Sequence, residues 1–266
     1  MNILDRIIID KRREVELKKS IIPTSQLEKS ILFERKTISL SNNLKQSTTG
    51  IIAEHKRRSP SKAEISYAFS VEEVVQGYEN GGACGVSVLT DAKYFGGSLD
   101  DLILARAALS IPLLRKEFVI DEYQILEAKA YGADLILLIA SCLSRQEIQK
   151  FSIFAKSLGL EVLLEVHDLN ELQQSIVPSL DMIGVNNRNL KTFNVSLENS
   201  MALSNEIPDD FVKISESGIS TSSDVLELQK HGYKGFLIGE SFMRSENPGD
   251  AIKTFVSQIN NHHKNI

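Results

Sequence analysis

The sequence predicts a single α/β domain over residues 1–266, a (β/α)8 TIM barrel with an N-terminal helical extension over residues 1–47. Three observations support this fold class. Eight short, mostly continuous apolar runs recur along the chain, as expected of parallel strands buried on both faces. Helix start and stop signals lie between these runs. No linker rich in Pro, Gly or Ser divides the chain. The competing architecture, a doubly wound open sheet, has less support because no G-x-G-x-x-G motif follows the first strand.

The N-terminal extension has a helical pattern. Residues 3–18 form an amphipathic repeat that places Ile3, Leu4, Ile7 and Ile8 on one side. We expect this helix to cover the catalytic rim of the barrel, although an extension of this kind can also plug the opposite end. A second short helix is predicted over residues 24–34. The basic run that begins at Lys11 sits beside acidic residues and is interpreted as a solvated helix face.

The barrel units follow in chain order. The expected strands are residues 50–54, 85–89, 112–115, 135–139, 162–166, 182–185, 212–215 and 235–238. Helix starts with capping-box spacing are Ser70 with Glu73 and Ser144 with Glu147, and Asp121 with Gln124 is a variant. Helix ends with a left-handed glycine are expected at Gly81, Gly132, Gly159 and Gly232. Eight such units fit a closed barrel.

Composition narrows the possible classes of protein. The net charge of -5 argues against a nucleic-acid surface, which requires a clustered basic face. No targeting or membrane segment is recognisable, so a soluble cytoplasmic protein is expected. Cys84 and Cys142 are interpreted as buried free thiols of a reducing compartment. The five histidines form no metal-ligand pattern, so no metal site is predicted.

Polar residues occur where the predicted strands end. The carboxyl ends of barrel strands carry the active site in this fold. The relevant groups are Glu54 and Lys56, then Arg115, Lys116 and Glu117, Glu165 and His167, Asn186, Asn187 and Arg188, Glu216, Ser217 and Gly218, and Gly239, Glu240 and Ser241. Glu54 and Lys56 are two residues apart, so both point to the same face of their strand. Together these residues predict one concentrated polar site.

The charges at this rim suggest a division of labour. Lys56 and Lys116 provide positive charge for an anionic substrate, while Glu54, Glu165 and Glu216 provide carboxylates. Repulsion and burial should spread the pKa values of these carboxylates, which allows acid and base roles to separate.

Small residues follow the last two predicted strands. Ser217-Gly218 and Gly239 resemble a phosphate cradle after strands 7 and 8, with the dipole of a following helix or short extra turn to assist. The same Ser-Gly pair also fits a plain strand-to-helix turn.

Plainer interpretations remain open for several other residues. Glu54 and Lys56 also fit a structural ion pair at the rim. His55 is expected to be packed or at the surface, and His167 to support its loop. The aromatic pair of Tyr94 and Phe95 fits either core packing or an aromatic substrate ring.

The chain resembles the indole-3-glycerol phosphate synthase family over nearly its whole length. The matching stretches are AEHKRRSPSK at 53–62, LTDAKYFGGS at 89–98, LLRKEF at 113–118, LEVH at 164–167, GVNNRNL at 184–190, SESGI at 215–219 and LIGES at 237–241. The resemblance implies a lyase of tryptophan biosynthesis, a decarboxylase. It closes the ring of 1-(2-carboxyphenylamino)-1-deoxyribulose 5-phosphate, then loses carbon dioxide and water, and it uses no cofactor.

The resemblance also implies roles for individual residues. Lys116 matches the general acid of ring closure, and Glu165 the second acid/base group, which assists dehydration. Lys56 matches the partner of the substrate carboxylate, while Glu54, Asn186 and Glu216 match polar groups at the reacting centre. The expected phosphate-binding residues are Ser59, Ser217, Gly218, Gly239 and Glu240. The expected residues around the substrate ring are Phe95, Phe118 and Arg188.

Three positions depart from the family pattern, namely Ala63, Glu117 and Ser196, and none carries chemistry. Residues 56–62 are expected to close over bound substrate as a mobile loop. The expected partner is a small phosphorylated molecule, with no nucleic acid or membrane, and a monomer is favoured. Other sugar-phosphate isomerases, a lysine Schiff-base aldolase and a catalytically silent binding barrel remain as alternatives.

Overall fold

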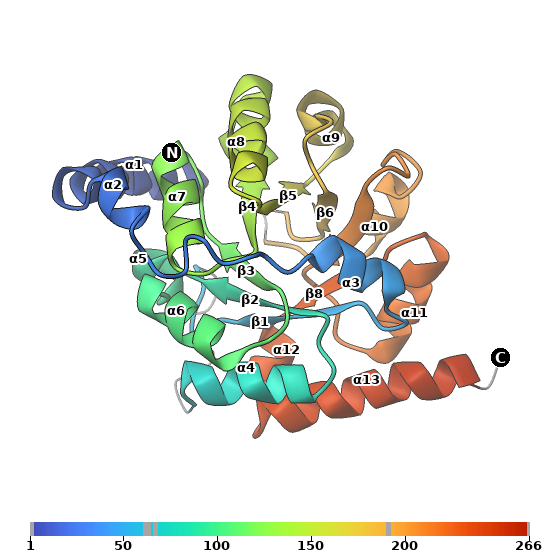
Figure 1. Cartoon of the computed structure of the whole chain (residues 1–266). Coiled ribbons are helices and arrows are strands. Elements are labelled where there is room, and N and C mark those ends of the chain that lie inside the picture. Colours follow the sequence, from blue (N-terminus) through green and yellow to red (C-terminus); the bar gives the residue numbers. More distant parts are fainter. Residues whose placement is uncertain (1–2, 61–64, 66–68, 190–192, 265–266) are drawn as a thin grey trace.

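The computed structural model of the chain describes residues 3–60, 65, 69–189 and 193–264. Its parallel strands close into a barrel in the order β1 to β8, with helices arranged around the outside (Figure 1). The strands are β1 (Ile51–His55), β2 (Gly85–Leu89), β3 (Leu113–Lys116), β4 (Leu135–Ile139), β5 (Glu161–Val166), β6 (Met182–Asn186), β7 (Val212–Glu216) and β8 (Gly235–Ile238). The predicted fold class is therefore confirmed.

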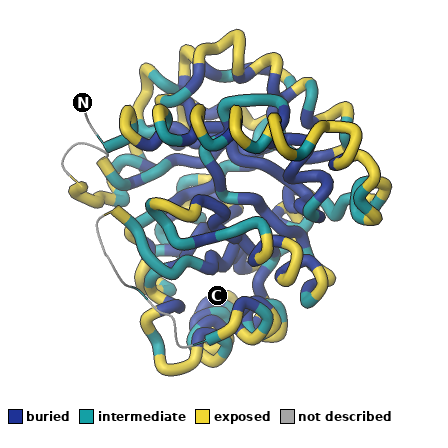
Figure 2. Tube along the Cα trace, turned by 90° about the vertical axis from the view of Figure 1, so that its left-hand side faces the viewer, coloured by how far each residue is buried: buried dark blue, intermediate teal, exposed yellow. Residues whose placement is uncertain are grey.

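The helices of the N-terminal extension and of the barrel follow one another in chain order. They are α1 (Ile3–Ile21), α2 (Thr24–Leu27), α3 (Leu40–Gln46), α4 (Val71–Asn80), α5 (Ala92–Phe95), α6 (Leu99–Ala108), α7 (Glu122–Ala130), α8 (Arg145–Ser157), α9 (Leu169–Ser175), α10 (Glu198–Leu203), α11 (Ser222–Lys230), α12 (Glu240–Met243) and α13 (Pro248–Lys264), with a 3-10 turn η1 (Ala140–Cys142) after β4. Burial is greatest along the strands, and exposed residues lie at the periphery (Figure 2).

Capping chemistry fixes the helix starts largely as predicted. Ser70 and Ser144 form complete capping boxes with Glu73 and Glu147. The Asp121 variant differs, because Asp121 accepts from the Tyr123 N–H while the Gln124 side chain accepts from the Ile120 N–H. The two side chains therefore satisfy donors at separate points of the turn.

Left-handed glycines at helix ends are confirmed at three of the four expected positions. Gly132, Gly159 and Gly232 have positive φ. Gly81 was predicted wrongly, because its φ is -79° and Gly82 takes the left-handed conformation at 96°. Gly81 is required for a different reason, since a Cβ there would lie 2.3 Å from Cγ2 of Ile252 in α13.

The extension differs from the prediction in its second half. The helix expected over residues 24–34 is the single turn α2, and turns follow it. The helix α3 was not predicted, and it packs its Leu40 and Leu44 against the interior cluster of the barrel. A Cβ on Gly85 would lie 2.7 Å from Leu40, and one on Gly235 would lie 3.1 Å from Leu44. Glycines at the first residues of β2 and β8 thus leave room for α3 to seal the amino-terminal end.

Leu44→Ala tests this seal. Leu44 is fully buried, so we expect the free energy of unfolding to fall by about 2–4 kcal/mol through lost burial and a residual cavity. Urea denaturation measures the change, with the 95 % exposed Ile31→Ala as the matched control. Equal stability of the two variants would show that α3 does not close the barrel.

Candidate active site

A cavity of about 490 Å³ opens at the carboxyl ends of the strands. It gathers side chains from most strands and from the N-terminal helix. Every residue to which the family resemblance assigned a catalytic or binding role lines it, namely Glu54, Lys56, Ser59, Phe95, Lys116, Phe118, Glu165, Asn186, Arg188, Glu216, Ser217, Gly218, Gly239 and Glu240. Arg115, His167 and Asn187, which the sequence also placed in the polar site at the rim, do not line it. The structure thus brings together residues that are up to 186 positions apart in the sequence, from Glu54 to Glu240.

Lys116 is the centre of the charged part of the cavity. Its Nζ lies 2.5 Å from Oε2 of Glu216 and 3.1 Å from Oε2 of Glu165. The other oxygen of Glu165 accepts from the Asn186 amide at 3.2 Å. Glu216 has room to reach Lys116 because β6 carries Gly184, where a Cβ would fall 2.3 Å from Oε1 of Glu216. The carboxylates of Glu165 and Glu216 are almost completely buried. The positive charge of Lys116 offsets the free-energy cost of burying them.

The two carboxylates are electrostatically unequal. Burial raises the pKa of Glu216 to about 7, since the repulsion from Glu165 adds to desolvation and offsets the attraction of Lys116. Burial also opposes ionisation of Glu165, but Lys116, His167 and the Asn186 hydrogen bond outweigh it and lower its pKa. Burial opposes the charge of Lys116 as well, yet Glu216 and Glu165 raise its pKa above the usual value. The cluster therefore holds a charged lysine, an ionised carboxylate and a carboxyl group that titrates near neutrality.

Glu54 and Lys56 form a second ion pair beside this cluster. Nζ of Lys56 lies 2.6 Å from Oε1 of Glu54, which confirms that both side chains point into the same space. A Cβ on Gly239 would lie 2.7 Å from Oε1 of Glu54. Gly239 therefore makes room for a carboxylate as well as lining the cavity, a packing role that the sequence prediction did not include.

Strained backbone forms the end of the cavity after β7. Ser217 and Gly218 have φ values of 68° and 82°, and Ser217 is one of the few non-glycine residues with positive φ. A Cβ on Gly218 would lie 2.4 Å from Cγ1 of Val195, so a larger residue meets both strain and a clash. Tight turns of this kind can form the backbone concavities that bind anions.

Two helices, α11 and α12, begin near the predicted phosphate cradle and differ in whether their first N–H groups are already bonded. α11 begins with a capping box of Thr221 and Asp224, and Asp224 accepts from the N–H groups of Ser220 and Thr221. Those two N–H groups, which precede α11, are therefore already engaged in its N-terminal cap. The short turn α12 begins at Gly239 and Glu240, which line the cavity directly.

The aromatic wall lies next to the N-terminal helix. The rings of Phe95 and Phe118 pack with their centroids 6.0 Å apart. Ile3, Leu4 and Ile7 of α1 line the same cavity, so this helix lies at the catalytic rim as expected.

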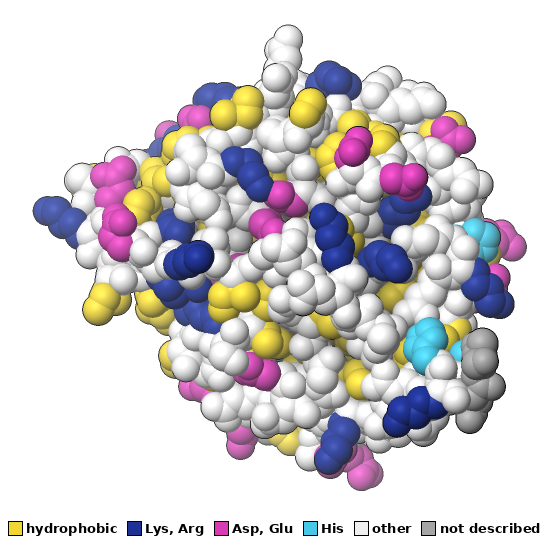
Figure 3. Space-filling view, turned by 45° about the vertical axis from the view of Figure 1, so that its right-hand side comes forward, with side chains coloured by type: hydrophobic (Ala, Val, Ile, Leu, Met, Phe, Trp, Pro, Cys, Tyr) yellow, Lys and Arg dark blue, Asp and Glu magenta, His cyan; other side chains and the backbone are white. Residues whose placement is uncertain are grey.

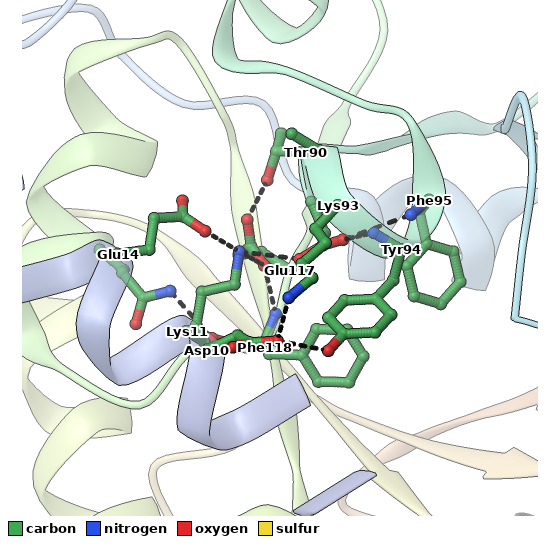
Figure 4. A network of polar contacts seen from close by, with 12 residues as sticks. Asp10, Lys11, Glu14, Thr90, Lys93, Tyr94, Phe95, Glu117 and Phe118 are labelled. Atoms are coloured by element: carbon green, nitrogen blue, oxygen red, sulfur yellow. Dashed lines mark hydrogen bonds and ion pairs between the residues drawn. The ribbon is translucent and has the colours of Figure 1, made fainter. Parts of the chain in front are cut away.

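Lys11 holds α1 at the rim through buried ion pairs. The prediction that Lys11 belongs to a solvated helix face was therefore wrong. Its side chain is 1 % exposed and lies 3.0 Å from Asp91, 3.1 Å from Glu117 and 2.8 Å from Glu14 (Figure 4). Glu117 also accepts from the Phe118 N–H at 2.8 Å. Burial opposes the charge, but the surrounding carboxylates raise the pKa of Lys11. Sequence periodicity places Lys11 on the same helix face as Ile7, which was the available signal.

Several other polar residues lie outside the cavity. Arg115 points away from the barrel interior toward Glu127 at 2.9 Å. His55 is packed as expected, and burial lowers its pKa to about 4. Cys84 and Cys142 are free thiols, partly rather than fully buried. Of the loop predicted to close over the substrate, residues 56–62, the last two lie outside the described residues. Nowhere in the described chain do three or more His, Cys, Asp or Glu side chains gather to hold a metal ion.

A closed barrel with a cavity of buried charged side chains at the carboxyl ends of its strands has the arrangement of a barrel enzyme. The sequence profile of the indole-3-glycerol phosphate synthase family matches residues 4–255. The chain belongs to that family of carboxy-lyases, which acts in tryptophan biosynthesis.

Individual relatives agree with this assignment. The chain is 47 % identical to indole-3-glycerol phosphate synthase of Bacteroides thetaiotaomicron, over 97 % of this chain and 99 % of that protein. It is 41 % identical to indole-3-glycerol phosphate synthase of Polaromonas sp., over 94 % of this chain and 97 % of that protein. A solved thiamine phosphate pyrophosphorylase from Pyrococcus furiosus shares the fold, with a TM-score of 0.60 and 16 % identity over 83 % of this chain and 99 % of that one. No helix in the described part of this chain is long and apolar enough to cross a bilayer.

Lys11→Met tests the attachment of α1. The change keeps the length of the side chain but leaves Asp91 and Glu117 without their shared cation. We expect the free energy of unfolding to fall by about 3 kcal/mol, the lower end for a broken buried pair, because Arg115 remains 3.7 Å from Glu117. KM should rise, since α1 carries part of the cavity wall.

Urea denaturation and steady-state kinetics measure the two effects of this change. The exposed Arg12→Met is the control. Stability and KM equal to those of the control would contradict a role for Lys11 in holding the rim.

Proposed function

We propose that the chain closes the indole ring of 1-(2-carboxyphenylamino)-1-deoxyribulose 5-phosphate and releases indole-3-glycerol phosphate, carbon dioxide and water. The observation that carries this proposal is Lys116 held between Glu165 and Glu216 in the cavity. Ring closure needs a proton donor at the ketose oxygen, and a buried ammonium aimed into the cavity is suited to that task. Residues at the other walls complete the fit to an aromatic, carboxylated and phosphorylated substrate.

Substrate binding divides among three parts of the cavity. Lys56 pairs with the substrate carboxylate in place of Glu54, whose own position is fixed by the gap at Gly239. Phe95, Phe118 and Arg188 enclose the aromatic ring. Ser59, Ser217, Gly218, Gly239 and Glu240 receive the phosphate, Glu240 through its backbone.

The chemistry divides between Lys116 and Glu165. Lys116 protonates the ketose oxygen as the new carbon–carbon bond forms, and the carboxylate then leaves as carbon dioxide, returning its electron pair to the ring. Dehydration follows: the ionised Glu165 takes a proton from the neighbouring methylene carbon, and the hydroxyl leaves with a proton from Lys116, which solvent has recharged after ring closure. The proton on Glu165 then returns to Lys116. Asn186 orients Glu165 through its amide, and Glu216 holds Lys116 in place. These steps are proton transfers at carbon and oxygen, so the proposal requires no cofactor.

The Schiff-base aldolase alternative is disfavoured by the same cluster. Such a lysine must be neutral to attack a carbonyl, and its pKa is usually lowered. Glu216 and Glu165 do the opposite to Lys116.

We further infer a single-domain cytoplasmic monomer that acts on a small molecule. The net charge of -5 supports the lack of a nucleic-acid partner. Basic and acidic side chains are also scattered together over the face in Figure 3, which has no basic stripe.

Lys116→Ala and Glu165→Gln test the two chemical roles. Each removes a positioned proton-transfer group, so we expect kcat to fall by about 10² to 10⁴, with KM for the substrate changed much less. Indole fluorescence during turnover measures both constants, and the exposed Lys150→Ala is the control. Near-normal kcat in either variant would remove that residue from the mechanism.

Gly218→Val tests the phosphate cradle. The new side chain must adopt a positive φ and displace Val195, which shifts the backbone donors. We expect a large rise in KM with a smaller effect on kcat. Inorganic phosphate should also inhibit this variant less than it inhibits the unaltered protein. If both constants were retained, the anion would have to bind elsewhere.

A further inference from the structure

Asn187 belongs to the polar rim that the sequence predicted, and the proposed mechanism leaves it unused. It directly follows β6, whose last residue, Asn186, lines the cavity and donates to Glu165 at 3.2 Å. Consecutive residues of an extended chain point to opposite faces, so the side chain of Asn187 points away from the cavity. It is 4 % exposed and does not line the cavity. One asparagine therefore lies inside the cavity and the next lies behind its wall.

The Asn187 amide makes four hydrogen bonds, which is all that an amide side chain can make. Its nitrogen Nδ2 donates to Oγ of Ser215 at 2.9 Å and to the Ser217 carbonyl at 3.0 Å. Its oxygen Oδ1 accepts from the Ser200 N–H at 3.1 Å and from Oγ of Ser200 at 2.8 Å. A backbone N–H can only donate and a carbonyl can only accept, so the amide cannot be reversed. The nitrogen therefore faces Ser217.

The surroundings hold this amide rigidly. Ser200 of α10 and Ser215 of β7 are fully buried, and their hydroxyl oxygens lie 2.7 Å apart. The buried hydroxyl of Tyr233 donates to the Ser200 carbonyl at 2.6 Å. The Asn187 N–H donates to the Glu216 carbonyl at 2.8 Å, which continues the pairing of β6 with β7. A buried polar network whose members are satisfied fixes their positions.

The bond from Asn187 ends on the strained residue of the predicted phosphate cradle. Ser217 has a φ of 68°, a conformation that is costly for a residue with a side chain. Such a conformation persists only where neighbouring groups hold it in place. The Asn187 amide supplies a hydrogen bond to the Ser217 carbonyl, and it thereby fixes the plane of the peptide that joins Ser217 to Gly218.

The same peptide carries a second polar group, the Gly218 N–H. A peptide unit is planar and trans, so its C=O and its N–H point in opposite directions. With the Ser217 carbonyl bound to Asn187, the Gly218 N–H points away from Asn187. It donates to no acceptor among the residues that the structure describes, and Gly218 lines the cavity. A backbone N–H that is unpaired beside a cavity is suited to an anion.

We propose that Asn187 is a positioning residue for the phosphate of the substrate. It holds the Ser217 carbonyl behind the cavity wall, so that the Gly218 N–H stays aimed at the phosphate oxygens. Asn187 does not touch the substrate and acts only through the peptide between Ser217 and Gly218. The phosphate is remote from the reacting carbons, so loss of this positioning should raise KM and leave kcat nearly unchanged. The inference rests on the proposed function, in which this peptide receives the phosphate.

Asn187→Ala tests this role because it removes the donor to Ser217 without changing a residue of the cavity wall. We expect the dissociation constant of inorganic phosphate to rise by about 10- to 100-fold, as for loss of a hydrogen bond to a charged group. Phosphorus NMR line broadening measures this constant without turnover. KM for the substrate should rise in the same range with kcat retained. By fluorescence titration, 2-(ethylamino)benzoate, which has the ring and carboxylate of the substrate but no phosphate, should bind the variant and the unaltered protein equally well.

Ser200→Ala is the matched control. It removes one hydroxyl from the same buried network, whereas the Ser200 N–H still donates to Oδ1 and keeps Nδ2 directed at Ser217. Both variants should be less stable in urea, but only Asn187→Ala should lose phosphate affinity. Asn187→Ser is a milder second variant in case Asn187→Ala does not fold. Its hydroxyl lies one bond closer to the backbone than Nδ2 and should not reach Ser217, so the same loss of phosphate affinity is expected.

Three results would overturn the inference. The first is equal phosphate affinity in the Asn187 variants and in Ser200→Ala. The second is a loss of affinity for 2-(ethylamino)benzoate that matches the loss for phosphate, because a general distortion of the cavity predicts it. The third is failure of the unaltered protein to bind phosphate. If phosphate binds as expected but no indole-3-glycerol phosphate forms, the proposed reaction is wrong, whereas the role of Asn187 at the anion site is supported.

Discussion

The shared ion pair of Lys116 with two buried carboxylates is the constraint on which the rest of the site depends. Glu54, Lys116, Glu165 and Glu216 come from β1, β3, β5 and β7, the alternate strands that supply one layer of a barrel interior. In most barrels such a layer is apolar. Here it is charged, and it is stable only because the opposite charges lie within hydrogen-bond distance. The intervening strands carry glycines where a side chain would clash with these carboxylates. Gly184 in β6 and Gly239 after β8 leave the volume that the carboxylates occupy.

The N-terminal extension completes the barrel at both ends. α3 fills the amino-terminal end with two leucines, against glycines that begin β2 and β8. α1 covers the aromatic side of the cavity and is fastened there by the buried charge of Lys11. Glu117, which follows Lys116 in the sequence, links that charge to the backbone of Phe118. Stability and substrate enclosure therefore share the same contacts.

Burial of the charged side chains separates their pKa values and also limits their exchange of protons with solvent. Excluding water separates the pKa values of Glu165 and Glu216, so one pocket offers both a base and a titratable acid near neutrality. The same exclusion slows exchange of protons with solvent, although the reaction takes up one proton in every cycle. The imidazole of His167 lies beside this cluster, 3.5 Å from Glu165 and 3.1 Å from Glu171.

The sequence by itself determined the barrel, its strands to within about a residue, and the cavity residues to which the family resemblance gave roles, whereas Arg115, Asn187 and His167 were expected in the same polar site and lie outside the cavity. Those features are local: apolar runs and caps specify the elements, and in a closed parallel barrel all strand ends meet at one rim. Only the tertiary structure decided that α3 seals the other end, that Gly81 is required by Ile252, and that Lys11 is buried although it begins a basic run. It also decided that His167 faces Glu165. The first three depend on which distant groups pack together, and local periodicity carries no record of a partner that lies tens to almost two hundred residues away.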